Sequence, residues 1–289
     1  MPRKKAKKSK SKSSKKSTKK SNKVLKNIFG TIKTIIILLF KLIKFIVILP
    51  FKTFKFFNEK KKELKETKEE KDKEDKLNSI PANYELFEIV DAQQGSFNKW
   101  EDKLHKSTIG IILGARGKGK TALGMKILEN VKATSKTKLY AMGFKKNDVP
   151  GWINVANEIN EVKSNAFVLI DEGGILFSSR KSMTDANQVL SDLILVSRHK
   201  NLSILFISQN SSNLDINILR QADYLLLKPS SLLQKDFERK KIKELYEDLN
   251  FNQYDEYKGI TYVYSDEFRG FVNNPLPSFW SLNISKSFK

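Results

Sequence analysis

Eight consecutive residues of this chain have the composition of a phosphate-binding loop. Residues 114–121 fit the pattern GxxxxGK[ST]. Glycines allow backbone N–H groups to wrap phosphate oxygens, Lys120 can reach the β- and γ-phosphates, and Thr121 can place its hydroxyl on Mg²⁺. A basic, glycine-rich turn without a ligand is the alternative. We predict a nucleotide site that uses ATP and Mg²⁺. Its nucleotide-binding residues are Gly114, Ala115, Arg116, Gly117, Lys118, Gly119, Lys120 and Thr121.

An acidic pair follows an apolar run farther along the chain. Residues 167–170 read Phe-Val-Leu-Ile and are followed by Asp171 and Glu172. In an α/β sheet, ligands bind at the carboxyl ends of the strands, so this is where a Walker B motif is expected. We predict that Asp171 holds Mg²⁺ and that Glu172 orients and polarises the attacking water. The alternative is an acidic cap at the end of a strand.

Two more polar residues are candidates for catalysis. Gln209 directly follows the apolar run at residues 203–208, where it can sense the γ-phosphate. The alternative is that Gln209 is a surface amide without a partner. Arg198 can reach the nucleotide of a neighbouring subunit and stabilise charge in the transition state. The alternative for Arg198 is a cation at the carboxyl end of a helix. The other arginines that compete for the catalytic role are Arg116, Arg180 and Arg220.

Short apolar runs that alternate with amphipathic stretches indicate βαβ units and a mostly parallel sheet. We expect one strand at 108–113 before the loop and a helix from the loop to about residue 131. The acidic pair follows a second strand, and a helix at 184–197 precedes the strand at 203–208. Further strands are expected at 224–228, 259–264 and 268–273.

The ordered segments 114–121, 167–172 and 197–209 resemble the FtsK/HerA superfamily of pumping ATPases, in which Walker A, Walker B and a sensor glutamine occur in this order. From about residue 85 to 280, the chain is similar to genome-packaging ATPases of membrane-containing viruses and to zonula occludens toxin-like phage assembly ATPases. The resemblance implies a RecA-like domain in a ring, often hexameric, that closes each site with a neighbour's arginine and drives DNA through its centre. Residues 178–181 could form a basic pore loop or a solvated loop.

The chain departs from the cellular chromosome translocases of this superfamily. Their large membrane domain and their DNA-reading winged-helix module are not recognised in it. A small viral or plasmid-borne member fits better.

The formal net charge of +22 is concentrated at one end of the chain. Residues 1–58 contain 18 Lys or Arg and no acid, which leaves 36 basic and 32 acidic residues in the remainder. A diffuse basic surface over the catalytic part is therefore not indicated, and attraction to polyanions comes mainly from the N-terminal arm or from local loops. The lack of Cys and the presence of only two His argue against a disulfide framework, a thiol nucleophile and a zinc site.

The N-terminal arm, residues 1–77, is expected to consist of three parts and to precede a catalytic domain at 78–289. We expect a disordered basic tail at 1–23, an apolar helix at 24–57 and a charged linker at 58–77. The six lysines of the apolar part share one helical face at 100° per residue, a pattern typical of a helix that lies in a membrane interface. A spanning helix and a buried core helix are the alternatives.

Together these patterns predict a membrane-associated ATPase that translocates DNA, as in viral genome packaging. Its expected partners are double-stranded DNA, an anionic membrane surface, further copies of itself in a hexamer, and capsid or membrane proteins. The ATPase domain is expected on the cytoplasmic side of a membrane, or in the host cytoplasm or at a virion membrane. The alternatives are a zonula occludens toxin-like ATPase for virion assembly or secretion, and a nucleotide-dependent membrane switch.

Overall fold

The computed structural model describes residues 29–45, 60–62, 64–65, 67–68, 71–72, 74–171, 183–281 and 283–284. Within them, the side chains of 159, 183–190 and 193 are not described. The chain divides into two compact units, Met1–Glu70 and Lys71–Lys289. The predicted tail at 1–23 lies outside the described residues, and the predicted division of the chain into four parts stays a prediction.

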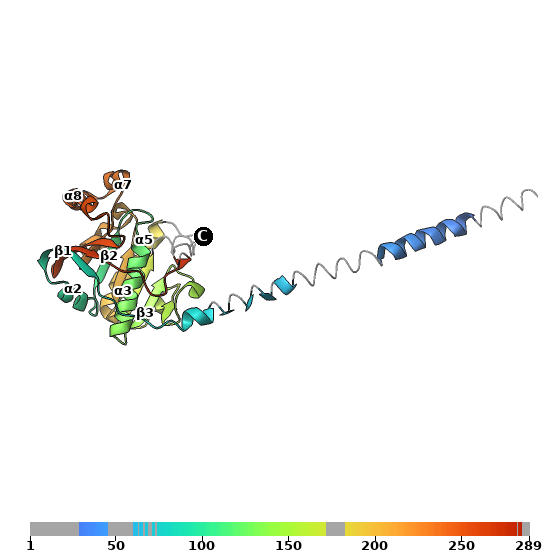
Figure 1. Cartoon of the computed structure of the whole chain (residues 1–289), viewed down its shortest axis with the longest axis horizontal. Coiled ribbons are helices and arrows are strands. Elements are labelled where there is room, and N and C mark those ends of the chain that lie inside the picture. The colour runs from blue at the N-terminus through green and yellow to red at the C-terminus, as the bar shows by residue number, and fades with distance from the viewer. Residues whose placement is uncertain are drawn as a thin grey trace, which may run out of the picture. The chain divides into compact units, whose positions relative to one another are not determined.

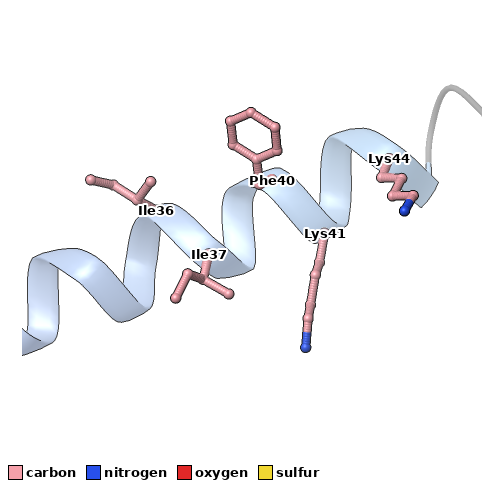
Figure 2. Close-up of a pocket in the computed structure, with 5 residues that line it drawn as sticks. All are labelled: Ile36, Ile37, Phe40, Lys41 and Lys44. Atoms are coloured by element: carbon pink, nitrogen blue, oxygen red, sulfur yellow. The ribbon is translucent and has the colours of Figure 1, made fainter.

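Residues 29–45 of the first unit form a helix. Its large apolar side chains are exposed, with Phe40 at 74% and Ile35 at 55%. Figure 2 shows Phe40 and Lys41 pointing to opposite sides of this helix. The hollow among the side chains drawn there lies on the surface of one helix, so it is no enclosed cavity. Among the described residues, no helix combines the length and apolar content that a membrane crossing needs.

The second unit is built on a nine-stranded mixed sheet (Figure 1), with the order β1-β9-β8-β7-β2-β6-β5-β3-β4. The strands from β7 to β4 are parallel to their neighbours, and β8, β9 and β1 extend the sheet in antiparallel pairs. Their bounds are β1 Glu88–Gly95, β2 Ile109–Leu113, β3 Lys138–Met142, β4 Ile153–Val155, β5 Ala166–Asp171, β6 Ser203–Ile207, β7 Tyr224–Leu227, β8 Ile260–Ser265 and β9 Phe268–Asn273.

Helices connect the strands and cover the sheet. The α-helices are α2 Phe97–Lys103, α3 Lys120–Thr134, α5 Met183–Lys200, α6 Ile216–Arg220, α7 Leu232–Phe237 and α8 Lys240–Asp248. Short 3₁₀ turns occur at η1 Lys146–Asp148, η2 Ile159–Glu161, η3 Ser211–Asn213 and η4 Phe251–Tyr254. The predicted α/β class with a mostly parallel sheet is confirmed.

The core has two parts because successive strand residues face opposite sides of the sheet. On β2, Ile111 packs in the cluster that includes Ile194 of α5 and Ile242 of α8. Its neighbour Ile112 packs in the cluster under α3. The central strands are covered on both faces, which explains why they are continuous apolar runs in the sequence and show no alternation.

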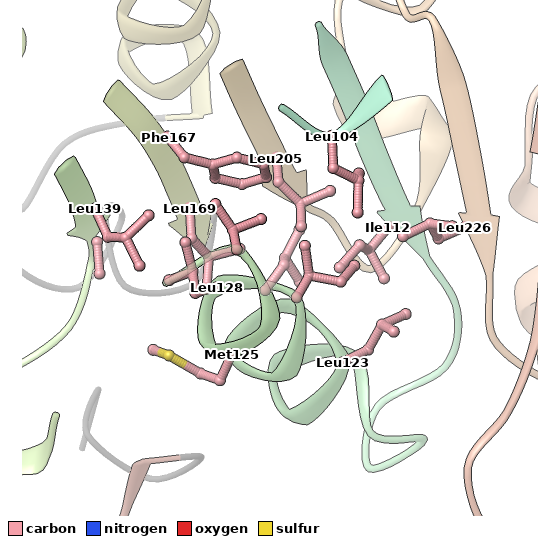
Figure 3. Close-up of a cluster of buried hydrophobic side chains, with 14 of the residues drawn as sticks. Leu104, Ile112, Leu123, Met125, Leu128, Leu139, Phe167, Leu169, Leu205 and Leu226 are labelled. Atoms are coloured by element: carbon pink, nitrogen blue, oxygen red, sulfur yellow. The ribbon is translucent and has the colours of Figure 1, made fainter. Parts of the chain in front are cut away.

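Helix α3 is fixed firmly on the sheet. Figure 3 shows Leu123 and Leu128 of α3 directed toward Ile112, Leu169 and Leu205 of three neighbouring strands. Leu123 and Leu128 are fully buried, and removing a side chain of this kind costs about 2–5 kcal/mol. The helix that begins in the glycine-rich loop therefore has a well-defined position.

Candidate functional site

The glycine-rich loop leaves the carboxyl end of β2 and enters α3. Gly114, Gly117 and Gly119 have φ values of 146°, 77° and 81°, which side chains rarely allow. A Cβ on Gly114 would lie only 2.6 Å from Cβ of Lys228, so the loop approaches the end of β7 closely. The Ala115 N–H donates to the Pro229 carbonyl at 3.0 Å and fastens the loop there.

Lys120 begins α3, and its side chain turns back into the loop. The residue is only 8% exposed. Its Nζ donates to the carbonyl oxygens of Gly114 at 2.7 Å and of Ala115 at 3.0 Å. The ammonium therefore lies inside the curve of the loop, where it can act as a point charge toward phosphate oxygens.

The two predicted magnesium ligands lie together. The Thr121 hydroxyl at the start of α3 donates to Oδ2 of Asp171, at the end of β5, over 3.2 Å. Mg²⁺ at nucleotide sites takes one or two protein oxygens and completes its shell with phosphate and water, so this pair fits the ion. Over the described part of the chain, no three His, Cys, Asp or Glu residues gather as a separate metal site.

Gln209 lies two residues beyond β6, and β6 lies between β2 and β5. The Ser208 N–H donates to the Ile112 carbonyl at 3.0 Å, which ties this segment to the strand before the loop. Gln209 is exposed, and its carbonyl accepts from Nε2 of Gln234 on α7. The structure thus places Gln209 at the carboxyl ends of the parallel strands, where the loop and Asp171 also lie.

Arg198 has the place of a cation at the carboxyl end of a helix, the alternative stated from the sequence, and does not lie between the helix and the following strand. It lies within the last turn of α5, because the helix continues to Lys200 and ends at Asn201 with φ 52°. The Leu202 N–H donates to the Ser197 carbonyl at 2.9 Å, as in a left-handed helix cap. Arg198 is exposed. Since α5 returns the chain to the start of β6, Arg198 lies near the amino ends of the parallel strands. The loop lies at their carboxyl ends, on the opposite side of the sheet.

The competing arginines also have defined places. Arg220 ends α6, just before β7, so it too lies at the edge opposite the loop. Arg116 is exposed within the loop itself. Arg180 and Glu172, like the predicted pore loop at 178–181, lie outside the described residues, so the assignment of Glu172 as the catalytic base stays a prediction.

One residue beside the loop was missed as a site residue, because Lys228 was counted only as the end of a strand. It follows β7 and is 1% exposed. Its Nζ donates to the Gly259 carbonyl at 3.0 Å, the Ile260 carbonyl at 3.1 Å and Asn274 Oδ1 at 2.7 Å. Burial lowers the pKa of Lys228 to about 7. The sequence feature that could have indicated this site is a lysine that directly follows an apolar strand and precedes a proline.

The parallel strands, the loop and the Thr121–Asp171 pair define the chain as a P-loop ATPase. The model of the zonular occludens toxin (Zot) family matches residues 121–225. This segment runs from the end of the loop into β7 and includes Asp171, Arg198 and Gln209. The match confirms the resemblance predicted from the sequence, and the chain is similar to this family over that segment. No curated protein matches the chain.

Several solved structures are similar in fold. The DNA-packaging ATPase B204 of Sulfolobus turreted icosahedral virus is 12% identical, with a TM-score of 0.41 over 60% of this chain and 99% of that one. The genome-packaging NTPase B204 of Sulfolobus turreted icosahedral virus 2, in complex with ATP-γS, is 13% identical, with a TM-score of 0.39 over 59% and 98%. The pCW3 conjugation coupling protein TcpA with ATPγS is 14% identical, with a TM-score of 0.42 over 73% of each chain.

Proposed function

We propose that this chain is a membrane-associated motor that uses ATP hydrolysis to translocate double-stranded DNA, as in viral genome packaging. The observation that carries the proposal is the meeting of Thr121 and Asp171, 3.2 Å apart, beside a loop of the correct length and with a buried Lys120. Mg²⁺ bound by this pair would neutralise charge on the phosphates. Lys120 would hold the phosphates, and Gln209 would sense the terminal one.

The strand order supports the finer fold assignment. β6 separates the strand that precedes the loop from the strand that ends in Asp171. A strand inserted at this point fits the additional-strand, RecA-like class. In such an arrangement Gln209, at the end of the inserted strand, lies between the loop and the acidic residue and can respond to both.

The position of Arg198 supports hydrolysis at subunit interfaces. Arg198 is exposed and lies at the sheet edge opposite its own loop, so it is poorly placed to act on the nucleotide that the same subunit binds. A neighbouring subunit whose loop faces this edge would gain a guanidinium for transition-state charge, a contribution of several kcal/mol. We infer a closed ring, a hexamer by resemblance.

The first unit supports attachment to an anionic membrane surface. The helix at 29–45 exposes apolar side chains such as Phe40 and carries Lys33, Lys41 and Lys44. Apolar contact with acyl chains and attraction of lysines to anionic headgroups act together in interfacial helices. Ile37 falls within the lysine face at 100° per residue, so the two faces are not cleanly separated.

The family match favours a second candidate function. Because it is the Zot family that matches residues 121–225, an ATPase for virion assembly or secretion, which acts on a protein or on virion exit, is the alternative. Both candidates use the same nucleotide site. They differ in whether duplex DNA is the substrate.

Steady-state ATP hydrolysis by the full chain, with and without duplex DNA, tests the proposal. We expect strong stimulation by DNA and loss of activity in Lys120→Ala and Glu172→Gln. Hydrolysis that is indifferent to DNA and still lost in both variants would favour the assembly ATPase. Tight nucleotide binding without turnover would contradict both motors and indicate a nucleotide-dependent switch.

A further inference from the structure

The end of β7 is joined to the phosphate-binding loop through the backbone around Lys228. The Lys228 N–H donates to the Leu113 carbonyl at 2.8 Å, and the Pro229 carbonyl accepts from the Ala115 N–H at 3.0 Å. Gly114 packs so closely on Lys228 that a Cβ there would meet its Cβ at 2.6 Å and its carbonyl oxygen at 2.9 Å. The backbone at Lys228 and Pro229 is thus in direct contact with the first two residues of the loop.

The side chain of Lys228 is held by three oxygen atoms. Nζ donates to the carbonyls of Gly259 and Ile260 and to Oδ1 of Asn274, over 2.7 to 3.1 Å. An ammonium group has three N–H donors, which match the three acceptors, whereas a neutral amine has two. The protonated form thus holds all three contacts, and deprotonation releases one of them.

The ammonium also lies close to the start of α3. A Cβ built on Gly119, which precedes α3, would lie 4.0 Å from Nζ of Lys228. A phosphate bound in the loop would attract the ammonium of Lys228 from this short distance. It would therefore favour the protonated form of Lys228, and by linkage the ammonium would strengthen phosphate binding.

We propose that Lys228 is a positioning residue of the nucleotide site, and that its ammonium group holds the phosphate-binding loop in the form that binds the phosphates of ATP and ADP. This inference rests on the proposed nucleotide binding and adds a residue and a pH dependence to it. Lys228 acts through Gly114 and Ala115 and is not required to touch the nucleotide itself.

The groups around Lys228 allow it to titrate near neutral pH. Burial is the only cause that lowers its pKa, to about 7. From α8, the hydroxyl of Tyr246 donates to the Lys228 carbonyl at 3.1 Å, and burial keeps the pKa of that phenol well above its usual range. The charged neighbours on the loop are Arg116, Lys118 and Lys120, and Lys258, which precedes Gly259, is exposed. We therefore expect nucleotide binding to weaken as pH rises above about 7.

Calorimetric titration of the full chain with Mg-ADP tests this inference. Measurements between about pH 6 and 9, in pairs of buffers with different ionisation enthalpies, give both Kd and the number of protons taken up on binding. The terminal phosphate of ADP titrates near pH 6 for every variant, so comparisons between variants remove its contribution. The variants are Lys228→Met, Asn274→Asp, the matched control Tyr246→Phe, and Lys120→Ala as a control for the site.

The wild type should take up as much as one proton per Mg-ADP above about pH 7. Lys228→Met should bind roughly ten- to hundredfold more weakly near pH 6, as for a lost hydrogen bond to a charged group, and should show no such uptake. Asn274→Asp should move the loss of affinity to higher pH, because a carboxylate beside Nζ favours the ammonium. Tyr246→Phe removes a contact to the same residue but leaves the ammonium, so proton uptake should persist.

Equal affinity and equal proton uptake in Lys228→Met and wild type would overturn the inference. If Lys228→Met does not fold, Asn274→Asp decides the question, since an unchanged pH profile in that variant contradicts the proposed role of the ammonium. A wild-type chain that binds no Mg-ADP would instead refute the proposed nucleotide site itself.

Discussion

Replacing Lys228 by Met should change how the stability of the protein depends on pH. The pKa of Lys228 is about 7 in the folded chain and 10.5 ordinarily. Between these values the unfolded chain binds more protons than the folded one, so the free energy of unfolding rises with pH. At about 1.4 kcal/mol per pH unit, the full gap amounts to about 5 kcal/mol, of which about 3 kcal/mol falls between about pH 7 and 9.5.

Urea denaturation of wild type and Lys228→Met at a series of pH values measures this effect. Other titrating groups are common to both proteins, so the difference between their unfolding free energies isolates Lys228. That difference should shift in favour of the wild type by about 3 kcal/mol from about pH 7 to 9.5. Below about pH 7 it should be constant, because Lys228 is then charged in both states. Parallel stability curves over the whole range would refute the reasoning.

Three other outcomes are expected. Glu129→Ala should lower the free energy of unfolding by about 3 kcal/mol in urea denaturation, because the fully buried Lys126 loses the closer of its two carboxylate partners, at 2.9 Å, and keeps only Glu85 at 3.3 Å; the double variant Lys126→Met/Glu129→Leu should lose less. Thr121→Ala and Asp171→Asn should each raise the Mg²⁺ concentration needed for half-maximal ATP hydrolysis, and unchanged Mg²⁺ curves would argue against the paired ligands. Mixing inactive Arg198→Ala subunits with inactive Lys120→Ala subunits should restore part of the ATPase activity, whereas no restoration would exclude an arginine supplied by a neighbour.

The sequence was most informative where strands are buried on both faces. Residues 111–113, 166–170 and 204–207 are continuous apolar runs followed by Gly114, Asp171 and Ser208, respectively, so both the strands and the site at their ends could be predicted. The two antiparallel strands β8 and β9 were also found. In contrast, β1 is mostly exposed at the edge of the sheet, and β3 and β4 carry no motif, so none of these three was predicted.

The least predictable features depend on contacts between distant segments. Lys228 and Asn274 are 46 residues apart, and only the fold brings the amide oxygen 2.7 Å from Nζ. The buried Glu129 likewise accepts from the N–H groups of Asn83 and Ser278, which lie on opposite sides of α3 in the sequence. The spacing of residues along the sequence does not predict such contacts. The end of α5 was misplaced because Asn201 acts as a left-handed cap, which only the backbone geometry shows.

Direct observation of movement along DNA tests the central proposal most directly. A short third strand annealed to one end of a linear duplex is displaced when a motor travels along the duplex, and its release can be followed by fluorescence. The full chain should displace the strand when ATP and Mg²⁺ are present, and Glu172→Gln should bind the same duplex without displacing it. Rapid ATP hydrolysis without displacement of the third strand, from duplexes of any length, would contradict DNA translocation. Virion assembly or secretion would then remain as the function of this ATPase.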